Sequence, residues 1–281
     1  MKVEVNNEYS SLKAVLLASV DTFKLHQPIN RTQEYFYKYY PPVKHRLIEQ
    51  QTAFVDVLTQ YEVQIIWAPQ RQDCTNQVNT RDVGFAIGSS FVVSPMAKRE
   101  RQREHLALEE VIESFQDTSI YRPTRGLIEG GDIVVDNKQI YVGLSERTNN
   151  LGYKWVLKTF GQDYEVVAIE LAEGYLHLDT VFNIISDGVA LADLSGIMKK
   201  SQSIIESRFE IISVGAEEQF QLATNVFSIN PNVVVCDNRN VATNEKIAKI
   251  GKELILLDYD EITKIGGSFR CGTCPLIRSD Y

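Results

Sequence analysis

The sequence predicts an α/β fold in which five ββαβ units close into a ring with pseudo-fivefold symmetry. Three observations predict it: a hairpin pattern recurs along the chain, a helix and a strand follow most hairpins, and the two chain ends each supply part of one unit. We expect a single domain over residues 1–281, because hydrophobic residues make up 44% of the chain, charged residues make up 23%, and no linker-like segment divides it.

The recurring hairpins are pairs of short apolar stretches, most of them joined by a turn signal. Such a pattern is typical of β-hairpins. The turn signals are Gly88-Ser89, Asp136-Asn137, Asp187-Gly188 and Asn230-Pro231. A polar residue opens each unit, and the openings lie 46 to 50 residues apart, at Asp82, Asp132, Asp179, Asn225 and Cys271. Repetition at a nearly fixed period indicates a repeat architecture.

Helical stretches follow the first four hairpins, and their apolar residues recur every three or four positions, at 101–115, 151–160, 195–207 and 244–253. Strands then return at 118–123, 164–171, 209–215 and 253–259. The last hairpin has no helix after it, but the N-terminal part supplies a strand, a helix and a strand at 12–19, 43–60 and 62–69. The two ends therefore make one unit together, and such closure removes exposed sheet edges, as in propellers.

Ring closure brings equivalent points of the units to the central axis, so the five opening residues are expected to converge in one cavity. The alternative is five similar polar caps at strand starts with no shared site. In "LHLD", the alternation of side chains along a strand places His177 and Asp179 on one face. His177 is therefore the candidate catalytic histidine, whereas His26, His45 and His105 are interpreted as surface or core residues.

The cysteines Cys74, Cys236, Cys271 and Cys274 are too few for a disulfide scaffold at this length. The pair Cys271 and Cys274 is only half of a metal site, and the few residues after it leave no room for the helix of a thioredoxin-like redox pair. A thiol nucleophile that pairs with a distant histidine fits better. Cys271 is in register with the other opening residues, so we interpret Cys274 as a packed small hydrophobe.

The overall charge and hydropathy exclude several classes of protein. A net charge of −8 disfavours a nucleic-acid partner, and no apolar run approaches the roughly 18 residues that a membrane helix needs. The first residues of the sequence, "MKVEVNNEYSS", contain no apolar signal region. We therefore expect a cytoplasmic protein with a small-molecule partner, and the sequence leaves open a homo-oligomer.

Several stretches resemble motifs of the guanidino-group-modifying superfamily, the penteins, which includes arginine deiminases, dimethylarginine dimethylaminohydrolases and arginine–glycine amidinotransferases. These stretches are "GLIEGGDIVVDNKQIYVGLSERTNNLG", "YLHLDTVFNII", "GGSFRCGTCPLIR", "YSSLKAVLL" and "TRD" at 80–82. The resemblance implies a five-bladed α/β propeller, in agreement with the ring predicted above. It implies no metal or organic cofactor, since a thiol and an imidazole would supply the nucleophile and the acid–base group.

The resemblance also implies a catalytic scheme. Cys271 would attack the guanidino carbon as a thiolate and form a covalent thiouronium intermediate. His177 would protonate the departing amine and then activate water, with Glu129 orienting its ring. Asp82 and Asp179 would hold the planar guanidinium through bidentate, charge-assisted hydrogen bonds.

Further substrate contacts follow from the same resemblance. Arg147 in "GLSERTN" matches an arginine that binds the substrate's α-carboxylate in the hydrolases, and Asp132 is another candidate substrate ligand. The run "KRERQRE" resembles a segment that carries a substrate arginine, for which we choose Arg101 over Arg99 and Arg103. The aromatic-rich segment 20–42 is interpreted as a packed surface loop, with a lid over the site as the alternative.

The predicted reaction is hydrolysis of arginine or a methylated arginine to citrulline and an amine, as in dimethylarginine dimethylaminohydrolases. The stretches "EGGD" and "SERTN" favour the hydrolases, and 281 residues leave no room for the additional helical domain of arginine deiminases. However, "LHLDTVFNII" and "GGSFRCGTC" are also close to the amidinotransferase versions, so transfer to a second amine is an alternative. A non-catalytic ring that serves as a binding module is a second one, because fold does not fix function.

Overall fold

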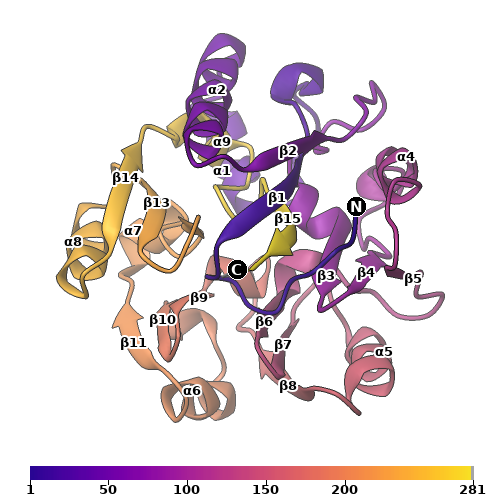
Figure 1. The fold of residues 1–281 in the computed structure, drawn as a ribbon. Coiled ribbons are helices and arrows are strands. Elements are labelled where there is room, and N and C mark those ends of the chain that lie inside the picture. Colours follow the sequence, from indigo (N-terminus) through magenta and orange to yellow (C-terminus); the bar gives the residue numbers. More distant parts are fainter. Residues whose placement is uncertain (280–281) are drawn as a thin grey trace.

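Five three-stranded sheets surround a common centre in the computed structural model. The structure describes residues 1–279. The last two residues of the predicted fifth unit, Asp280 and Tyr281, lie outside this range. Each sheet forms one blade, and the ring is seen nearly face on in Figure 1. In every blade the middle strand pairs antiparallel with one neighbour, which is its hairpin partner in four of the blades, and parallel with a strand at the outer side of the ring. The predicted five-unit α/β ring is confirmed.

Four blades are built from consecutive segments of the chain. Their strands are β3 (Gly84–Ile87), β4 (Ser90–Val93) and β5 (Ser119–Tyr121); β6 (Ile133–Asp136), β7 (Gln139–Leu144) and β8 (Glu165–Glu170); β9 (Phe182–Ser186), β10 (Val189–Ala192) and β11 (Glu210–Ser213); and β12 (Phe227–Ser228), β13 (Val233–Asp237) and β14 (Glu253–Leu257). Three of the four hairpins turn at a residue whose backbone angle φ is positive, namely Gly88, Asn137 and Gly188. Glycine and asparagine tolerate this conformation best, which explains the turn signals in the sequence.

The fifth blade joins the two ends of the chain. β1 (Leu12–Leu17) pairs antiparallel with β15 (Cys274–Arg278) and parallel with β2 (Gln64–Trp67). In Figure 1 the indigo β1 lies beside the yellow β15. Closure of the ring by the N- and C-terminal strands is therefore confirmed.

The outer helices cross from the hairpin of each blade to its last strand. They are α2 (Lys44–Gln60), α4 (Leu106–Ile112), α5 (Asn150–Phe160), α6 (Lys199–Glu206) and α8 (Val241–Lys249). Three of the predicted ranges need correction. The range 195–207 overlaps the turn η5 (Leu194–Gly196), and α6 begins only at Lys199. The range 101–115 contains a short turn, η2 (Arg99–Arg101), followed by α4, and the helix predicted at 244–253 begins and ends earlier, at 241 and 249.

Further helices lie in the connections and were not predicted. These are α1 (Arg31–Tyr39), α3 (Thr80–Val83), α7 (Ala216–Phe220) and α9 (Asp260–Lys264), with further one-turn 3-10 helices η1 (Val20–Thr22), η3 (Gly130–Asp132), η4 (Leu178–Thr180) and η5 (Leu194–Gly196). The interpretation of 20–42 as a loop is therefore wrong for its second half. The side chain of Asn30 accepts a hydrogen bond from the backbone of Gln33 and begins α1 as an N-cap.

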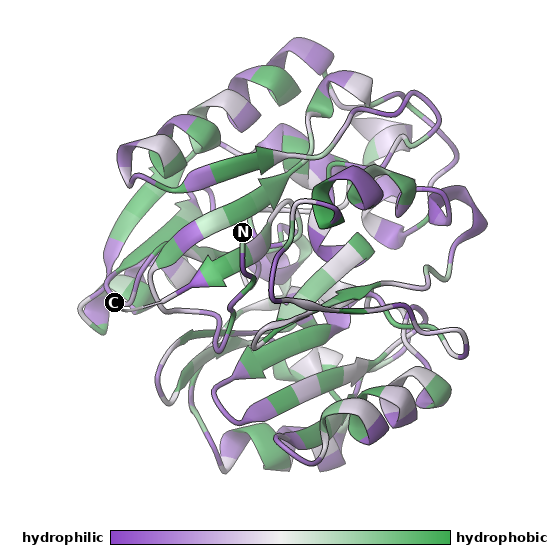
Figure 2. Cartoon of the chain, turned by 45° about the vertical axis from the view of Figure 1, so that its right-hand side comes forward, coloured by the Kyte–Doolittle hydropathy of each residue, from purple (hydrophilic) through white to green (hydrophobic). Residues whose placement is uncertain are grey.

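Apolar side chains fill the spaces between neighbouring blades, and Figure 2 shows the strands as the most hydrophobic parts of the chain. The cluster beside the closing blade includes Leu16 on β1, Leu276 on β15 and Phe91 on β4, all fully buried. Burial of each such side chain stabilises the fold by about 2 kcal/mol. The chain ends are thus fixed by packing as well as by strand pairing.

The opening residues lie slightly before the strand starts at which they were expected. Asp82 is in α3, Asp132 in η3 and Asp179 in η4, while Asn225 and Cys271 precede β12 and β15. His177 and Asp179 accordingly do not share a strand face, because His177 is the N-cap residue of η4. One helical turn and a short strand have the same length in sequence, so the alternation of polar and apolar residues did not distinguish them.

Candidate active site

Hydrogen bonds between neighbouring blades surround the axis of the ring. They run from Arg81 N to the carbonyl of Cys271 (3.1 Å), from Cys271 N to Asn225 Oδ1 (3.0 Å), from Asn225 Nδ2 to the carbonyl of Asp179 (3.1 Å) and from Leu178 N to Asp132 Oδ1 (2.8 Å). Every blade contributes one of these residues, and all of the residues are buried. The structure therefore brings the five opening positions together at one place.

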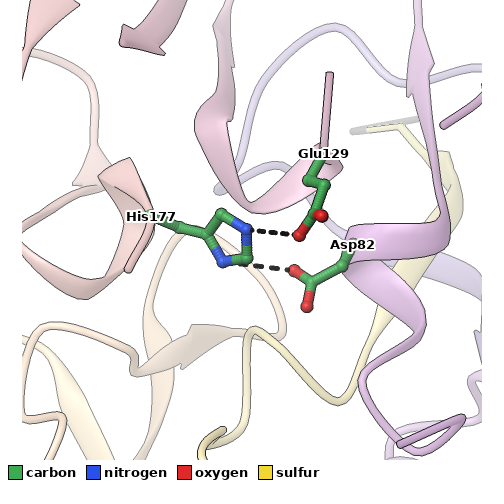
Figure 3. A group of neighbouring side chains, drawn as sticks. All are labelled: Asp82, Glu129 and His177. Carbon is green, nitrogen blue, oxygen red and sulfur yellow. Dashed lines mark hydrogen bonds and ion pairs between the residues drawn. The ribbon is translucent and has the colours of Figure 1, made fainter. Parts of the chain in front are cut away.

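His177 lies between two carboxylates that come from different blades (Figure 3). Its Nε2 is 2.8 Å from Oε2 of Glu129, and its Nδ1 is 3.5 Å from Oδ1 of Asp82. The close approach depends on a glycine, because a Cβ added at Gly131 would lie only 2.7 Å from the imidazole and 2.8 Å from Asp82. The "EGGD" sequence thus places an acid and a backbone segment directly against the histidine.

The surroundings of His177 and Glu129 keep both groups charged. Burial disfavours the imidazolium, but Asp82, the hydrogen bond to Glu129 and the charge of Asp132 outweigh it and raise the pKa of His177 to about 9. Burial likewise opposes ionisation of Glu129, but His177, Arg101 and Arg147 lower its pKa to about 2. At neutral pH the pair is an imidazolium donating to a carboxylate, which suits a general acid.

Cys271 is fully buried beside Asp179, with Sγ 3.6 Å from Oδ2 and 3.9 Å from Oδ1. Burial and the charges of Asp179 and Asp82 raise the pKa of the Cys271 thiol well above its usual range. The thiol is therefore protonated in this ligand-free structure at neutral pH. The second cysteine, Cys274, begins β15 and packs within the apolar cluster of the closing blade, as the sequence predicted.

Asp82 and Asp179 each have one oxygen held by a buried arginine. Arg101 Nη1 donates to Oδ2 of Asp82 at 2.6 Å, and Arg270 Nη1 donates to Oδ2 of Asp179 at 2.7 Å. The other oxygen of Asp82 is buried and accepts no hydrogen bond from the described residues. Among the three arginines considered for the run at 98–104, Arg101 is the one whose side chain points inward.

The remaining arginines of that run lie at the surface. Arg99 is exposed, and Arg103 pairs with Asp73 at 3.2 Å while two thirds of its side chain is exposed. Arg101, in contrast, also donates to Glu104 from Nε (3.0 Å) and Nη2 (2.8 Å). Its guanidinium is therefore fixed by protein acceptors, and its predicted contact with substrate stays a prediction.

Asp132 and Arg147 are buried, and protein groups occupy their polar atoms. Asp132 accepts from Leu178 N and, at 2.7 Å, from the hydroxyl of Ser145. Burial raises the pKa of Asp132 to about 7 despite the opposing charge of His177. Arg147 donates to Glu129 at 3.3 Å and to the carbonyl of Ile29 at 2.7 Å. The substrate-binding roles of both residues stay predictions.

Within the part of the chain that the structure describes, one group of side chains has the spacing to hold a metal ion. Its members are Asp82, Glu129 and His177, whose ligand atoms lie within 4.8 Å of one another. A histidine must lose its proton before it binds a metal. The raised pKa of His177 makes this costly at neutral pH, and Glu129 already occupies its Nε2. The geometry of the trio therefore fits proton transfer better than metal binding.

A cavity of about 680 Å³ adjoins the buried site without being lined by its reactive atoms. Its wall includes Ile29 and Asn30 before α1, Leu176 next to His177, Thr180 next to Asp179, and Gly266 near Cys271. Ile29, which lines the cavity, accepts a hydrogen bond from Arg147 through its carbonyl, and Arg147 also donates to Glu129. The segment before α1 is thus linked to the catalytic groups through Arg147.

The charged residues of this cluster that were not predicted include Arg270 and Glu8. Arg270 precedes the nucleophile candidate and contacts Glu8, which lies near the other end of the chain, at 3.0 Å. Charged residues are rarely buried without a partner, so the apolar surroundings of Arg270 in "GGSFRCGTCPLIR" were an available signal. Nothing in the local sequence around Glu8 distinguishes it from a surface acid.

Comparison with known proteins shows which family this chain is similar to. A family model described as eukaryotic N,N-dimethylarginine dimethylhydrolase matches residues 20–278. A curated relative, the uncharacterized protein YkgA of Bacillus subtilis, is 35% identical over 285 residues, which cover 99% of this chain and 96% of YkgA.

Three solved structures are similar in fold, each at less than 25% identity. SxtG, an amidinotransferase from Microseira wollei, matches with a TM-score of 0.83 and 19% identity, over 98% of this chain and 97% of its own. The N-terminal domain of ArgZ, a cyanobacterial arginine dihydrolase bound to product, gives 0.86 and 22%, over 96% and 99%. A Pseudomonas aeruginosa dimethylarginine hydrolase variant with citrulline gives 0.78 and 22%, over 94% and 99%. Within residues 1–279, none of the helices has the length and hydropathy to cross a bilayer.

Proposed function

The chain belongs to the N,N-dimethylarginine dimethylhydrolase family, and on that premise we propose that it hydrolyses the guanidino group of arginine or a methylated arginine, with Cys271 as nucleophile. The products would be citrulline and ammonia or a methylamine. One observation carries the proposal: Cys271 lies 3.6 Å from Asp179 in the same buried cluster in which His177 sits between Asp82 and Glu129. The citrulline bound to the Pseudomonas aeruginosa relative supports this choice of product.

Asp82 and Asp179 supply the binding site for the guanidinium. A guanidinium is a poor electrophile because its charge is delocalised, and carboxylates that accept from its N–H groups concentrate positive character at the central carbon. Arg101 and Arg270 each hold Oδ2 of these acids. The other oxygen, Oδ1, faces the reactive groups, at 3.5 Å from His177 Nδ1 in Asp82 and 3.9 Å from Cys271 Sγ in Asp179, and would accept from the substrate there. This arrangement supports two single charge-assisted hydrogen bonds from the substrate, one to each acid, in place of the bidentate pairs first expected.

Substrate binding activates the thiol. The two carboxylates that raise the pKa of Cys271 are the groups that a bound guanidinium would neutralise. The Cys271 thiol then loses its proton to water, and the thiolate sulfur forms a bond to the guanidino carbon. His177 donates its proton to the substrate nitrogen as the carbon–nitrogen bond breaks, so that a neutral amine departs and a thiouronium remains on Cys271.

Water completes the reaction. His177 has given up its proton and is now a base, and Glu129 holds its ring through Nε2. Water transfers a proton to His177 as its oxygen bonds to the thiouronium carbon. The carbon–sulfur bond then breaks, which releases citrulline and restores the thiol and the imidazolium. If a second amine takes the place of water, the same intermediate gives the amidinotransferase reaction.

An assay with defined substrates tests the proposal. Arginine, monomethylarginine and dimethylarginine are incubated with the protein, with and without glycine, and citrulline and guanidinoacetate are measured. We expect citrulline from at least one substrate, whether or not glycine is present. Guanidinoacetate that appears only with glycine would establish the transferase instead. No product from any of the three would contradict the proposal.

The two cysteines provide a matched pair of variants. Cys271→Ser is expected to abolish turnover, because a serine hydroxyl without a thiolate's nucleophilicity cannot attack the guanidino carbon. Cys274→Ser should largely retain turnover, since Cys274 packs away from Asp179. Comparable losses in the two variants would remove Cys271 from the role of nucleophile.

A further inference from the structure

Arg270 contacts three separate parts of the chain next to Asp179. Its Nη1 donates to Asp179 at 2.7 Å, and its Nη2 donates to Glu8 at 3.0 Å and to the carbonyl of Ile133 at 2.9 Å. The side chain is 1% exposed, and those of Asp179 and Glu8 are 0% and 4% exposed. A guanidinium in this position has a fixed plane, because both of its terminal nitrogens are held by acceptors on different elements.

The same pattern occurs on the other side of the site. Two rows of ion pairs each run from an outer acid through an arginine to an inner aspartate. One row is Glu104, Arg101 and Asp82, and the other is Glu8, Arg270 and Asp179. In each row the arginine holds Oδ2 of the inner aspartate. The inner aspartates are the pair proposed above to bind the guanidinium. Each of them is paired with an arginine, and that arginine is paired with the outer acid.

We propose that Arg270 is a positioning residue that fixes one oxygen of Asp179 and leaves the other free for a substrate N–H, with Glu8 holding Arg270 in place. The proposal rests on the proposed function for the identity of the ligand. It adds two residues, Arg270 and Glu8, to the machinery of the site. Neither of them would touch the substrate, and both would act through Asp179.

The electrostatics of Asp179 give this role a measurable consequence. Burial raises the pKa of Asp179, and the charge of Arg270 is the largest of the effects that oppose it. The other charged or titratable groups that face Asp179 are His177 on its own turn, Asp82 and Arg81 on α3, and Cys271 beside Arg270.

Removal of Arg270 should therefore raise the pKa of Asp179 further. A protonated carboxyl is a weaker acceptor for a cationic guanidinium than a carboxylate is. Binding would be lost at low pH and recovered as the pH rises through the higher pKa.

Glu8 has a comparable relation to Arg270. Burial opposes its ionisation, but the charges of Arg270, Arg81 and Arg278 lower the pKa of Glu8 to about 2. Arg270 and Arg81 repel each other, and Glu8, which is 3.6 Å from Arg81, lies against both. Without the charge of Glu8, this repulsion would move Arg270 from its place on Asp179.

The decisive experiment measures binding without turnover, in a Cys271→Ser background. Dissociation constants for L-arginine and Nω,Nω-dimethyl-L-arginine are determined by calorimetry from pH 6 to 9, with and without Arg270→Gln. We expect binding about tenfold weaker at pH 7, and a difference that shrinks towards pH 9. Arg270→Lys should keep the parent's pH profile, because it retains the charge. Arg208→Gln, which removes a surface pair with Glu165, is the matched control.

A second readout needs no ligand. The side-chain carboxyl signal of Asp179 is followed by ¹³C NMR in the ligand-free protein and is assigned by its loss in Asp179→Asn. It should titrate at higher pH in Arg270→Gln than in the parent. An unshifted titration, or a loss of binding that is equal at every pH, would show that Arg270 is only a structural residue and overturn the proposal.

Two further outcomes are decided by the same measurements. If Arg270→Gln does not fold, Glu8→Gln replaces it and should shift the Asp179 titration in the same direction by a smaller amount; no shift in this variant overturns the proposal. If the Cys271→Ser parent binds neither arginine derivative, the proposed function fails, and the NMR titration still decides whether Arg270 controls Asp179.

Discussion

Individual reactive groups in this protein owe their protonation states to neighbours on other blades. His177 is a cation at neutral pH because Asp82 and Glu129 face its two ring nitrogens, and the Cys271 thiol is neutral because burial and two aspartates oppose its ionisation. Under the proposed function, these are the protonation states before a cationic substrate binds. The arrangement predicts that each group changes its charge only when substrate neutralises the aspartates.

The two-step chemistry can be divided by substitution at the residue level. His177→Ala should still form some thiouronium adduct on Cys271 but should not hydrolyse it, because water activation is lost, and turnover should fall by about 10²–10⁴-fold. Intact mass spectrometry after incubation with the guanidino substrate measures the adduct. His45→Ala, which changes an exposed histidine, is the control. An adduct that hydrolyses as fast as in the parent would argue against the role of His177.

Among the secondary-structure elements, α1 and the segment before it have the largest bearing on access to the site. Gln33 is fully buried, and its Nε2 donates to Asn76 (3.0 Å) and to the carbonyl of Ile265 (2.8 Å), while its Oε1 accepts from Ile29 N (3.0 Å). These bonds hold Ile29, whose carbonyl accepts from Arg147, and Arg147 in turn contacts Glu129. We therefore expect this segment to control access to the catalytic groups.

This element yields a prediction about access. Gln33→Ala leaves buried backbone groups unpaired, at a cost of about 1–3 kcal/mol that falls on the local segment. We expect faster hydrogen exchange in residues 24–40 and faster alkylation of Cys271 by iodoacetamide. Gln27→Ala, at an exposed position before α1, should change neither rate. If alkylation of Cys271 is equally slow in both variants, the segment does not control access.

The stability of the whole molecule depends on the blade that joins the two ends of the chain. Leu16 on β1 and Leu276 on β15 are separated by most of the chain, yet both are buried in one apolar cluster. Leu16→Ala and Leu276→Ala should each lower the free energy of unfolding by about 2–5 kcal/mol in a urea titration. Leu256→Ala on the outer strand β14 is the control, because 51% of that side chain is exposed. A loss confined to Leu16→Ala would mean that β15 contributes little to closure.

Periodicity predicted the architecture of the ring better than it predicted the details of the site. The repeat of the opening residues located Asp82, Asp179 and Cys271, since each blade must present the same point to the axis. Local geometry was harder to predict, because one-turn helices such as η4 replace the expected strand starts. The supporting charges of Glu8 and Arg270 were missed, since their partners lie far away in sequence and buried charges are uncommon.

Closure of the ring by β1 and β15 also has a consequence for synthesis of the protein. A ribosome makes the chain from the N-terminus, so β1 leaves it long before its partner strand exists, and domains beyond about 100–150 residues commonly pass through incomplete intermediates. Throughout that time β1 has an open edge, and the site contains Asp82, Glu129 and His177 but no Cys271. Nascent protein should therefore be inert towards guanidines until Cys271 and β15 have left the ribosome, and chains truncated before β15 should need chaperones more than chains that contain it do.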